Sequence, residues 1–164
     1  MPIDDRAHLP FSIEAPAPLP HVSRRALANV RDALPIPKHC PHCGEDVALV
    51  ENSVIYNGKT YGKWPYIYRC APCDAYVGLH PHTDIPLGTL AKKPLRKARI
   101  AAKAHFITMC RANKWGRDTA YAWLADAMGI TAEECHFGMF DIDQAEQAGV
   151  SCLANTPPDG DQIS

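Results

Sequence analysis

The 164-residue chain has no long apolar run, and its N-terminus lacks the apolar core of a signal peptide. Membrane-spanning helices need roughly 18 to 20 consecutive apolar residues, and no segment approaches that length. The chain starts Met-Pro-Ile-Asp-Asp-Arg, without an apolar stretch. We therefore expect no signal peptide, no membrane partner and a reducing, cytoplasmic setting, in which cysteines stay thiols instead of forming disulfides.

Two further stretches lack charge of one sign. Residues 85–117 contain no Asp or Glu but nine Lys or Arg, whereas residues 118–164 contain no Lys or Arg but nine acidic residues. The formal net charge of the whole chain is only −1, which by itself indicates neither nucleic acid nor membrane as a partner. The separation of charge along the chain is more informative than the total.

Two Cys-x-x-Cys pairs are the strongest chemical signal in the sequence. Cys40 and Cys43 form the first pair, Cys70 and Cys73 form the second, and 26 residues separate the pairs. Zinc binds four Cys or His ligands in a tetrahedron, and two such turns at the ends of paired strands supply them. Gly44 permits a tight turn after the first pair. We predict one structural Zn²⁺ ion in a zinc ribbon, whose small sheet needs the metal in order to fold.

Other interpretations of the cysteines are weaker. Redox-active Cys-x-x-Cys motifs occur singly at the start of a helix, whereas both pairs here lie among strand-like residues. Three neighbouring histidines offer an alternative fourth ligand, namely His39, His42 and His80. The remaining cysteines, Cys110, Cys135 and Cys152, lack ligand spacing, and we expect them to be small buried apolar groups.

The predicted fold is α+β, with a small zinc ribbon of three or four short antiparallel strands followed by two or three helices packed on it. The segments are an N-terminal Pro-rich arm at 1–37, the ribbon at 38–85, a helical subdomain at 86–152 and a flexible tail at 153–164. The arm holds seven of the fifteen prolines, which leave room for one short helix within residues 21–34. Ser23 is its expected N-cap.

Apolar runs and turn residues predict the elements of the ribbon. Strands are expected at 47–50, 54–56, 66–68 and 75–77. Asn57-Gly58 follows the second of these strands and is typical of a type I′ hairpin turn. The ribbon is therefore expected to contain a tight hairpin at residue 57.

Helical periodicity appears after residue 90. Helices are expected from about 91 to 113, from 118 to 128 with Gly129 as the stop, and from Asp141 to about 148. Thr131 with Glu134 resembles a capping box. Basic residues of the first of these helices line one stripe, and apolar residues together with His105 form a separate arc.

Beyond the cysteines, several longer strings resemble one family. The strings are Cys73-Asp74-Ala75-Tyr76-Val77-Gly78 with His80, then Pro86-Leu87-Gly88-Thr89-Leu90-Ala91, and later Trp123-Leu124-Ala125. With the Cys-Pro-x-Cys-Gly turn, and over about residues 40–145, the chain resembles a family of short phage and prophage proteins, the zinc-finger-containing domain family. The resemblance implies a zinc-bearing module of viral or prophage origin, and it implies no particular activity.

Nucleic-acid binding is the favoured functional hypothesis. A zinc ribbon followed by a helix with a basic stripe presents a surface that neutralises phosphates. The candidate residues of the stripe are Lys92, Lys93, Arg96, Arg99 and Lys103. Tyr66, Tyr68 and Tyr76 of the ribbon are candidates for stacking on bases.

Two alternatives stay open. The chain can instead be a phage-encoded factor that binds and modulates a host protein, with the Pro-rich arm and the acidic C-terminal third as its surface. It can also be a small nuclease, in which His80 and His105 act with His82, Asp84 and the nearby arginines. The more common outcome for a residue like His105 is a core histidine bonded to a partner such as Asp74 or Tyr76.

Overall fold

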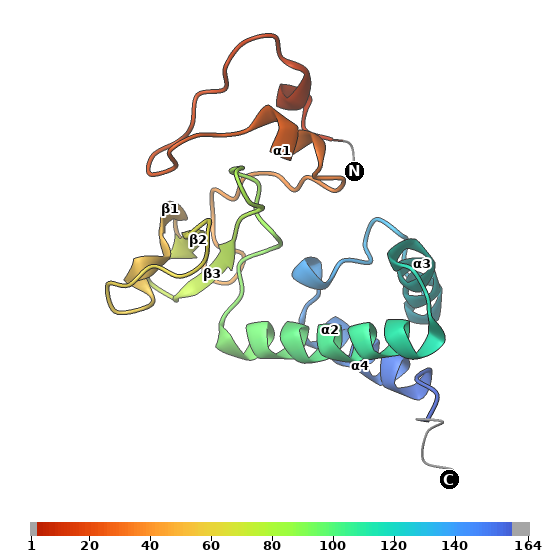
Figure 1. Ribbon diagram of the computed structural model, residues 1–164. Helices are drawn as coiled ribbons and strands as arrows, with labels where there is room; N and C mark the ends of the chain where they lie inside the picture. Colours follow the sequence, from red (N-terminus) through yellow and green to blue (C-terminus); the bar gives the residue numbers. More distant parts are fainter. Residues whose placement is uncertain (1–2, 159–164) are drawn as a thin grey trace. The chain divides into compact units, whose positions relative to one another are not determined.

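All three strands described in the chain lie within its first 92 residues, whereas three of its four described α-helices follow them. The computed structural model describes residues 3–158, which form the α+β protein that the sequence predicts (Figure 1). The chain divides into two compact units, unit 1 at residues 1–92 and unit 2 at residues 93–164. Each unit has its own hydrophobic core.

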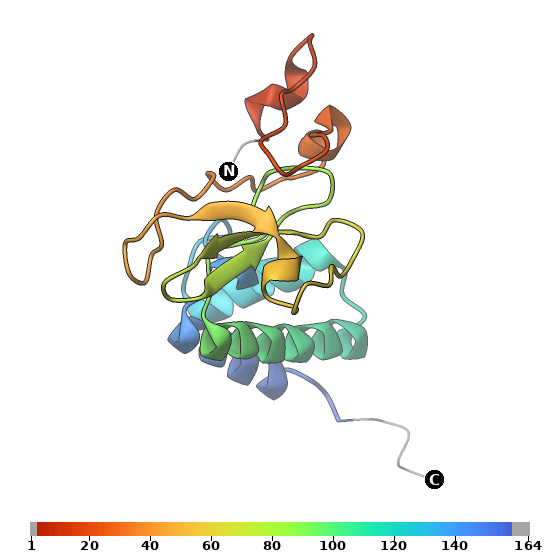
Figure 2. The same cartoon turned by 90° about the vertical axis from the view of Figure 1, so that its left-hand side faces the viewer.

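The sheet of unit 1 is antiparallel and has the strand order β1–β2–β3 (Figure 2). Its strands are β1 at Ala48–Glu51, β2 at Tyr66–Cys70 and β3 at Ala75–Gly78. Cys70 pairs with Ala75 across β2 and β3, so the second Cys-x-x-Cys pair forms the turn of a hairpin. The strands predicted at 47–50, 66–68 and 75–77 are confirmed with small shifts of their ends.

The predicted strand at 54–56 is wrong, although the tight turn expected at Asn57-Gly58 is present and is closed by the Lys59 amide, which bonds the Tyr56 carbonyl at 3.2 Å. Residues Asn52–Val54 form a short 3-10 helix, η2, and the chain then turns through Asn57 and Gly58, which both have positive φ. Val54 and Tyr56, which would share one face of the expected strand, stay 50% and 41% exposed, so no buried face supports a strand there. The Asn52 side chain instead bonds the backbone of Tyr61 in both directions, at 2.8 and 3.2 Å, and closes a longer loop.

The N-terminal segment contributes to the same core as the sheet. After a 3-10 helix, η1 at Asp5–His8, comes α1 at Arg24–Ala28, and the Ser23 hydroxyl accepts a hydrogen bond from the Ala26 amide as predicted. The helix is shorter than expected, because tight turns at Asn29 and Val30 end it well before residue 34. Apolar residues from this segment and from the sheet pack together, among them Leu19, Val22, Leu27, Tyr68, Leu79 and Ile85.

Residues 80–86 form a loop, here named the hub loop, that ties the parts of unit 1 together. Three successive carbonyls accept hydrogen bonds from three segments: His82 from the Ser23 amide, Thr83 from Trp64 Nε1, and Asp84 from the Tyr68 hydroxyl. The Asp84 carboxylate adds a fourth tie, because both of its oxygens accept from the Arg6 guanidinium, at 2.7 and 2.9 Å. The N-terminal segment, the 52–65 loop and β2 therefore meet at one short loop.

Unit 2 is helical. Its elements are α2 at Lys93–Asn113, α3 at Arg117–Met128, the 3-10 helix η3 at Phe137–Met139 and α4 at Ile142–Ala154. Helix α3 ends at Gly129, which adopts the left-handed conformation as predicted, with φ +68. Helix α4 lies along α2 (Figures 1 and 2), and a Cβ added at Gly149 would sit 3.6 Å from the Ala102 Cα. Small residues thus allow the two helices to approach closely.

Two details of unit 2 differ from expectation. Thr131 and Glu134 exchange the hydrogen bonds of a capping box, yet the next helical element is only the 3-10 turn η3. Helix α4 starts after Asp141 as expected, with a capping box formed by Asp141 and Gln144, but it runs to Ala154, since its buried face continues through Cys152. The expected tail at 153–164 therefore begins inside α4, and its residues 159–164, like residues 1–2 of the arm, lie outside the described residues. No helix within residues 3–158 is both long and apolar enough to cross a membrane.

Candidate metal centre and basic helix

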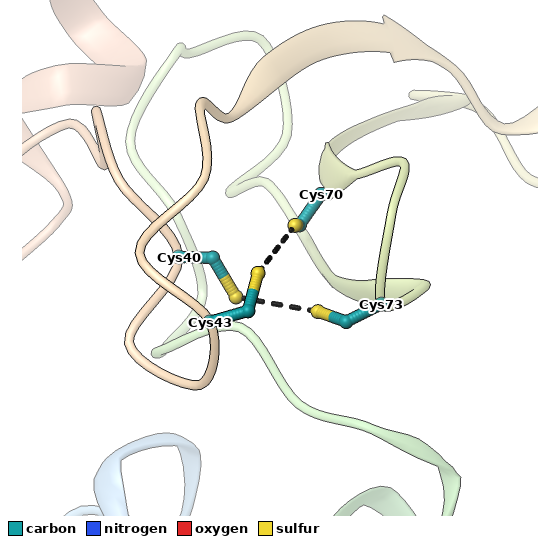
Figure 3. A group of neighbouring side chains, drawn as sticks. All are labelled: Cys40, Cys43, Cys70 and Cys73. Carbon is teal, nitrogen blue, oxygen red and sulfur yellow. Dashed lines mark hydrogen bonds between the residues drawn. The ribbon is translucent and has the colours of Figure 1, made fainter.

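The two Cys-x-x-Cys pairs meet at one point in unit 1 (Figure 3). The Sγ atoms of Cys40, Cys43, Cys70 and Cys73 all lie within 4.8 Å of one another. The Cys40–Cys73 and Cys43–Cys70 sulfurs are each 3.4 Å apart. A tetrahedral zinc site with metal–sulfur bonds of about 2.3 Å has sulfur–sulfur edges of about 3.8 Å. The four sulfurs therefore need only small shifts to hold one Zn²⁺ ion.

The two turns that carry the cysteines repeat one backbone design. In the first, the Gly44 amide bonds the Cys40 carbonyl at 2.9 Å, and in the second the Asp74 amide bonds the Cys70 carbonyl at the same distance. Gly44 and Asp74 both have positive φ, +77 and +57, directly after the second cysteine of each pair. In each turn a residue in the left-handed conformation reverses the direction of the chain, and both cysteine sulfurs of the turn point toward the same cluster.

Backbone amides and crowding set the charge of the thiols. The Ala75 amide, which bonds the Cys73 sulfur, lowers the pKa of Cys73 to about 7, and the other three thiols act in the same direction. The hydrogen bond from the Cys73 amide to the Cys70 sulfur also lowers the pKa of Cys70. Burial and the neighbouring thiols outweigh this effect and raise the pKa of Cys70 to about 12. One thiolate forms readily in the cluster while another is opposed, so a bound cation is needed to bring all four sulfurs to the thiolate form.

The alternative ligands of the sequence are placed elsewhere. Nε2 of His42 lies 2.9 Å from the Leu90 carbonyl, to which it donates, and Nδ1 of His39 lies 3.4 Å from the Asp46 carboxylate. The cluster of possible ligands found within residues 3–158 consists of the four cysteines. Cys135 and Cys152 are buried in unit 2 as expected, and Cys110 is half-buried there.

A closed set of four cysteines on a small antiparallel sheet defines a structural zinc module, because no position is left for a reacting ligand. A protein family described as the zinc-finger-containing domain matches residues 36–153, and the chain belongs to this family. No curated protein and no solved structure shows a significant match to the chain. Family and site together establish zinc binding.

The basic residues of the predicted stripe differ in their surroundings. Lys92, Lys93 and Lys103 are exposed, whereas Arg96 and Arg99 are half-buried. Neither Lys93 nor Lys103 makes an ion pair with any residue between 3 and 158. The acidic residues of the described C-terminal third therefore leave these lysines uncovered.

Arg99 has a structural contact that the sequence does not reveal. Its Nε donates to the Phe140 carbonyl at 2.8 Å, just before the N-terminus of α4. Burial of the guanidinium lowers the pKa of Arg99 to about 10, against the opposite effect of the Asp141 carboxylate. Arg99 thus joins α2 to the start of α4, and it offers less of its charge to solvent than the lysines do.

His105 does not lie in the core, and that expectation is wrong. Its side chain is exposed on α2, and it lines a groove between α2 and α4 with Ala101, Glu146 and Val150. The helical period of the sequence placed Ala101 on the same apolar arc as His105, and Ala101 is also exposed. The helices in fact touch at Ala102 and Gly149, and the flank beyond that contact stays open.

The residues of the nuclease hypothesis that lie in unit 1, namely His80, His82 and Asp84, have structural partners there. The Asp84 side chain is only 3% exposed and is held by Arg6. His82 Nδ1 lies 3.0 Å from Nε2 of His21, and the half-buried His80 shapes the hub loop through its backbone. The Arg6 contact was missed from sequence, because a lone arginine far from its partner leaves no pattern. The proposed acid–base cluster thus gains no support from these placements.

Proposed function

We propose that this zinc-binding protein, of the phage or prophage origin that its motifs imply, binds nucleic acid through the exposed lysines of α2. The single observation that carries the proposal is a 21-residue helix without an acidic residue, whose exposed lysines are unpaired within the described chain. Lys93, Lys97 and Lys103 are three such exposed lysines. Neutralising phosphates with cations that have no internal partner releases counterions and so favours binding.

The zinc has a structural role in this proposal. The metal fixes the ribbon of unit 1, and its four protein ligands leave it no role in chemistry. Two exposed isoleucines, Ile100 and Ile107, interrupt the basic face of α2. These isoleucines place exposed apolar side chains between the lysines. A face that combines lysines with exposed apolar side chains can also contact a protein.

Salt-dependent binding tests the proposal. We expect the zinc-loaded protein to bind a short DNA duplex, with affinity that falls steeply as salt rises. The double substitution Lys93→Ala/Lys103→Ala should weaken binding and reduce the slope of log affinity against log salt by about 2, because each lost phosphate contact removes about 0.9. Fluorescence anisotropy over a salt series measures both quantities.

A matched variant removes two charges elsewhere. Arg25 and Lys38 are exposed residues of unit 1, and Arg25→Ala/Lys38→Ala should leave the salt slope unchanged. Absence of binding at low salt would contradict the proposal and direct attention to a protein partner. Equal losses in the two double variants would show that the chain attracts DNA by total charge and not through α2.

A further inference from the structure

The loop between β1 and β2 displays two tyrosines to solvent. Tyr56 is 41% exposed and Tyr61 is 57% exposed. Their rings contact each other in a T-shaped arrangement with centroids 4.8 Å apart. In such a pair one ring meets the other through its edge, so both faces of that ring are left uncovered by its partner. Figure 1 shows this loop, in yellow, projecting from the sheet.

The loop is held rigidly although it is exposed. Both polar groups of the Asn52 side chain bond the backbone of Tyr61, and the Gly58 amide bonds the Ser53 carbonyl at 2.9 Å. Gly58 and Gly62 adopt positive φ at the two bends of the loop, with φ +87 and +82. A surface that is already ordered loses little conformational freedom when it binds, so these contacts prepare the tyrosines for a ligand.

The charge of the loop favours an anionic ligand. Residues 52–65 contain Lys59 and Lys63 and no acidic residue, and both lysines are exposed. Neither lysine makes an ion pair with any residue between 3 and 158. Glu51, at the end of β1, is the acidic residue that flanks the loop in sequence. Aromatic faces beside cations are the combination that binds bases and phosphates of a single strand.

The tyrosines named from the sequence suit this role less well. Tyr68 is 3% exposed and belongs to the core, Tyr66 is half-buried against Trp64 with ring centroids 5.0 Å apart, and Tyr76 is also half-buried. The rings of Tyr66 and Tyr68 are used in folding unit 1. The tyrosines at 56 and 61 are both exposed, and neither is among the residues packed in the core of unit 1.

The geometry points to residues 56–63 as a docking surface for single-stranded nucleic acid, in which unpaired bases stack on Tyr56 or Tyr61 and phosphates lie against Lys59 and Lys63. A single strand is specified because the bases of a duplex already cover one another's faces, and only unstacked bases offer a face to a tyrosine. This inference rests on the proposed function and assigns to unit 1 a contact separate from the lysines of α2.

The test compares a single-stranded oligothymidylate of about 16 nucleotides with a duplex of the same length. Tyr56→Ala/Tyr61→Ala should weaken binding of the single strand about 5- to 150-fold, the loss expected when one base is no longer stacked. Binding of the duplex should change less than twofold. Tyr56→Phe/Tyr61→Phe keeps both rings and should bind the single strand like the unaltered protein.

Controls separate this inference from the proposed function. Val54→Ala removes an exposed apolar side chain from the same loop and should have no effect, and zinc content should stay at one ion in every variant. If Tyr56→Ala/Tyr61→Ala binds the single strand normally while Lys93→Ala/Lys103→Ala weakens duplex binding, the loop inference is overturned and the proposed function stands. If the tyrosine variant alone loses affinity, the loop binds nucleic acid and the assignment to α2 fails. Absence of binding to either probe at low salt overturns both.

Discussion

Gly44 and Asp74 occupy equivalent positions in the two cysteine turns, yet they reach the left-handed conformation by different means. Glycine has no Cβ to clash with the following carbonyl, and aspartate is among the few residues that tolerate this region. Asp74 is also held by Arg69, whose Nε donates to its carboxylate at 3.0 Å. Adding a Cβ at Gly44 would meet no atom within 4 Å, so backbone strain alone limits substitution there.

We predict that Gly44→Ala lowers the free energy of unfolding of the zinc-loaded protein by about 1 to 2 kcal/mol, the usual penalty for a left-handed residue with a Cβ. Gly44→Asn should cost less, because its short polar side chain is tolerated there. Urea unfolding and competition for zinc with a chelator measure the two effects. Equal stability of the alanine and asparagine variants would show that the turn does not need its left-handed residue.

The hub loop explains how elements that are remote in sequence form unit 1. Its carbonyls accept hydrogen bonds from the N-cap of α1, the 52–65 loop and β2, and its Asp84 carboxylate accepts two hydrogen bonds from Arg6. The hydrogen bonds that Arg6 donates to Asp84, and then those it donates to Asp4, raise the pKa of Arg6, so the guanidinium is charged at any physiological pH. A buried carboxylate of this kind depends on its cation.

Removing that cation is therefore costly. We predict that Arg6→Ala lowers the free energy of unfolding by about 3 kcal/mol, because the Asp84 carboxylate is left buried and unpaired. Arg25→Ala, at an exposed position of α1, should change it by less than about 0.5 kcal/mol. Chemical denaturation of the zinc-loaded proteins gives both values, and similar values for the two variants would mean that water replaces Arg6 without cost.

The sequence was sufficient to predict elements in which residues of one type recur at a regular period or at a characteristic spacing. The cysteine spacing indicated the ribbon and its ligands, and the alanine-rich period of α2 marked that helix to within two residues of its observed start. The same methods failed where a single side chain decided the backbone, as Asn52 does for the loop that replaced the expected strand. They also failed at the hub loop, since backbone carbonyls accept hydrogen bonds whatever the residue type.

At the scale of the molecule, the zinc ligands lie in unit 1 and none of them lies in the core of unit 2. Cys40 and Cys70 are part of the core of unit 1, whereas the core of unit 2 is built from α2, α3, η3 and α4 without a zinc ligand. Metal removal should therefore act unequally on the two units, because binding free energy of a structural zinc is folding free energy of the unit that holds it.

We predict that chelation of zinc unfolds unit 1 and leaves unit 2 helical. Hydrogen exchange read by mass spectrometry should show protection lost across residues 3–92 and kept across the helices α2, α3 and α4. Far-ultraviolet circular dichroism should retain most of its helical signal. Loss of protection in both units together would mean that unit 2 depends on unit 1 for its stability.

Contacts to the hub loop show that the folded unit begins earlier in the chain than the region matched by the family. The family match begins at residue 36, yet Leu19, Val22 and Leu27 fill the same core as the ribbon, and Arg6 neutralises Asp84. Genetic exchange that moved only the matched region would transfer a ribbon that lacks four of the eleven buried residues of its core. The first 35 residues and the ribbon must therefore be inherited together, or a recombinant must acquire a new cover for the hub loop.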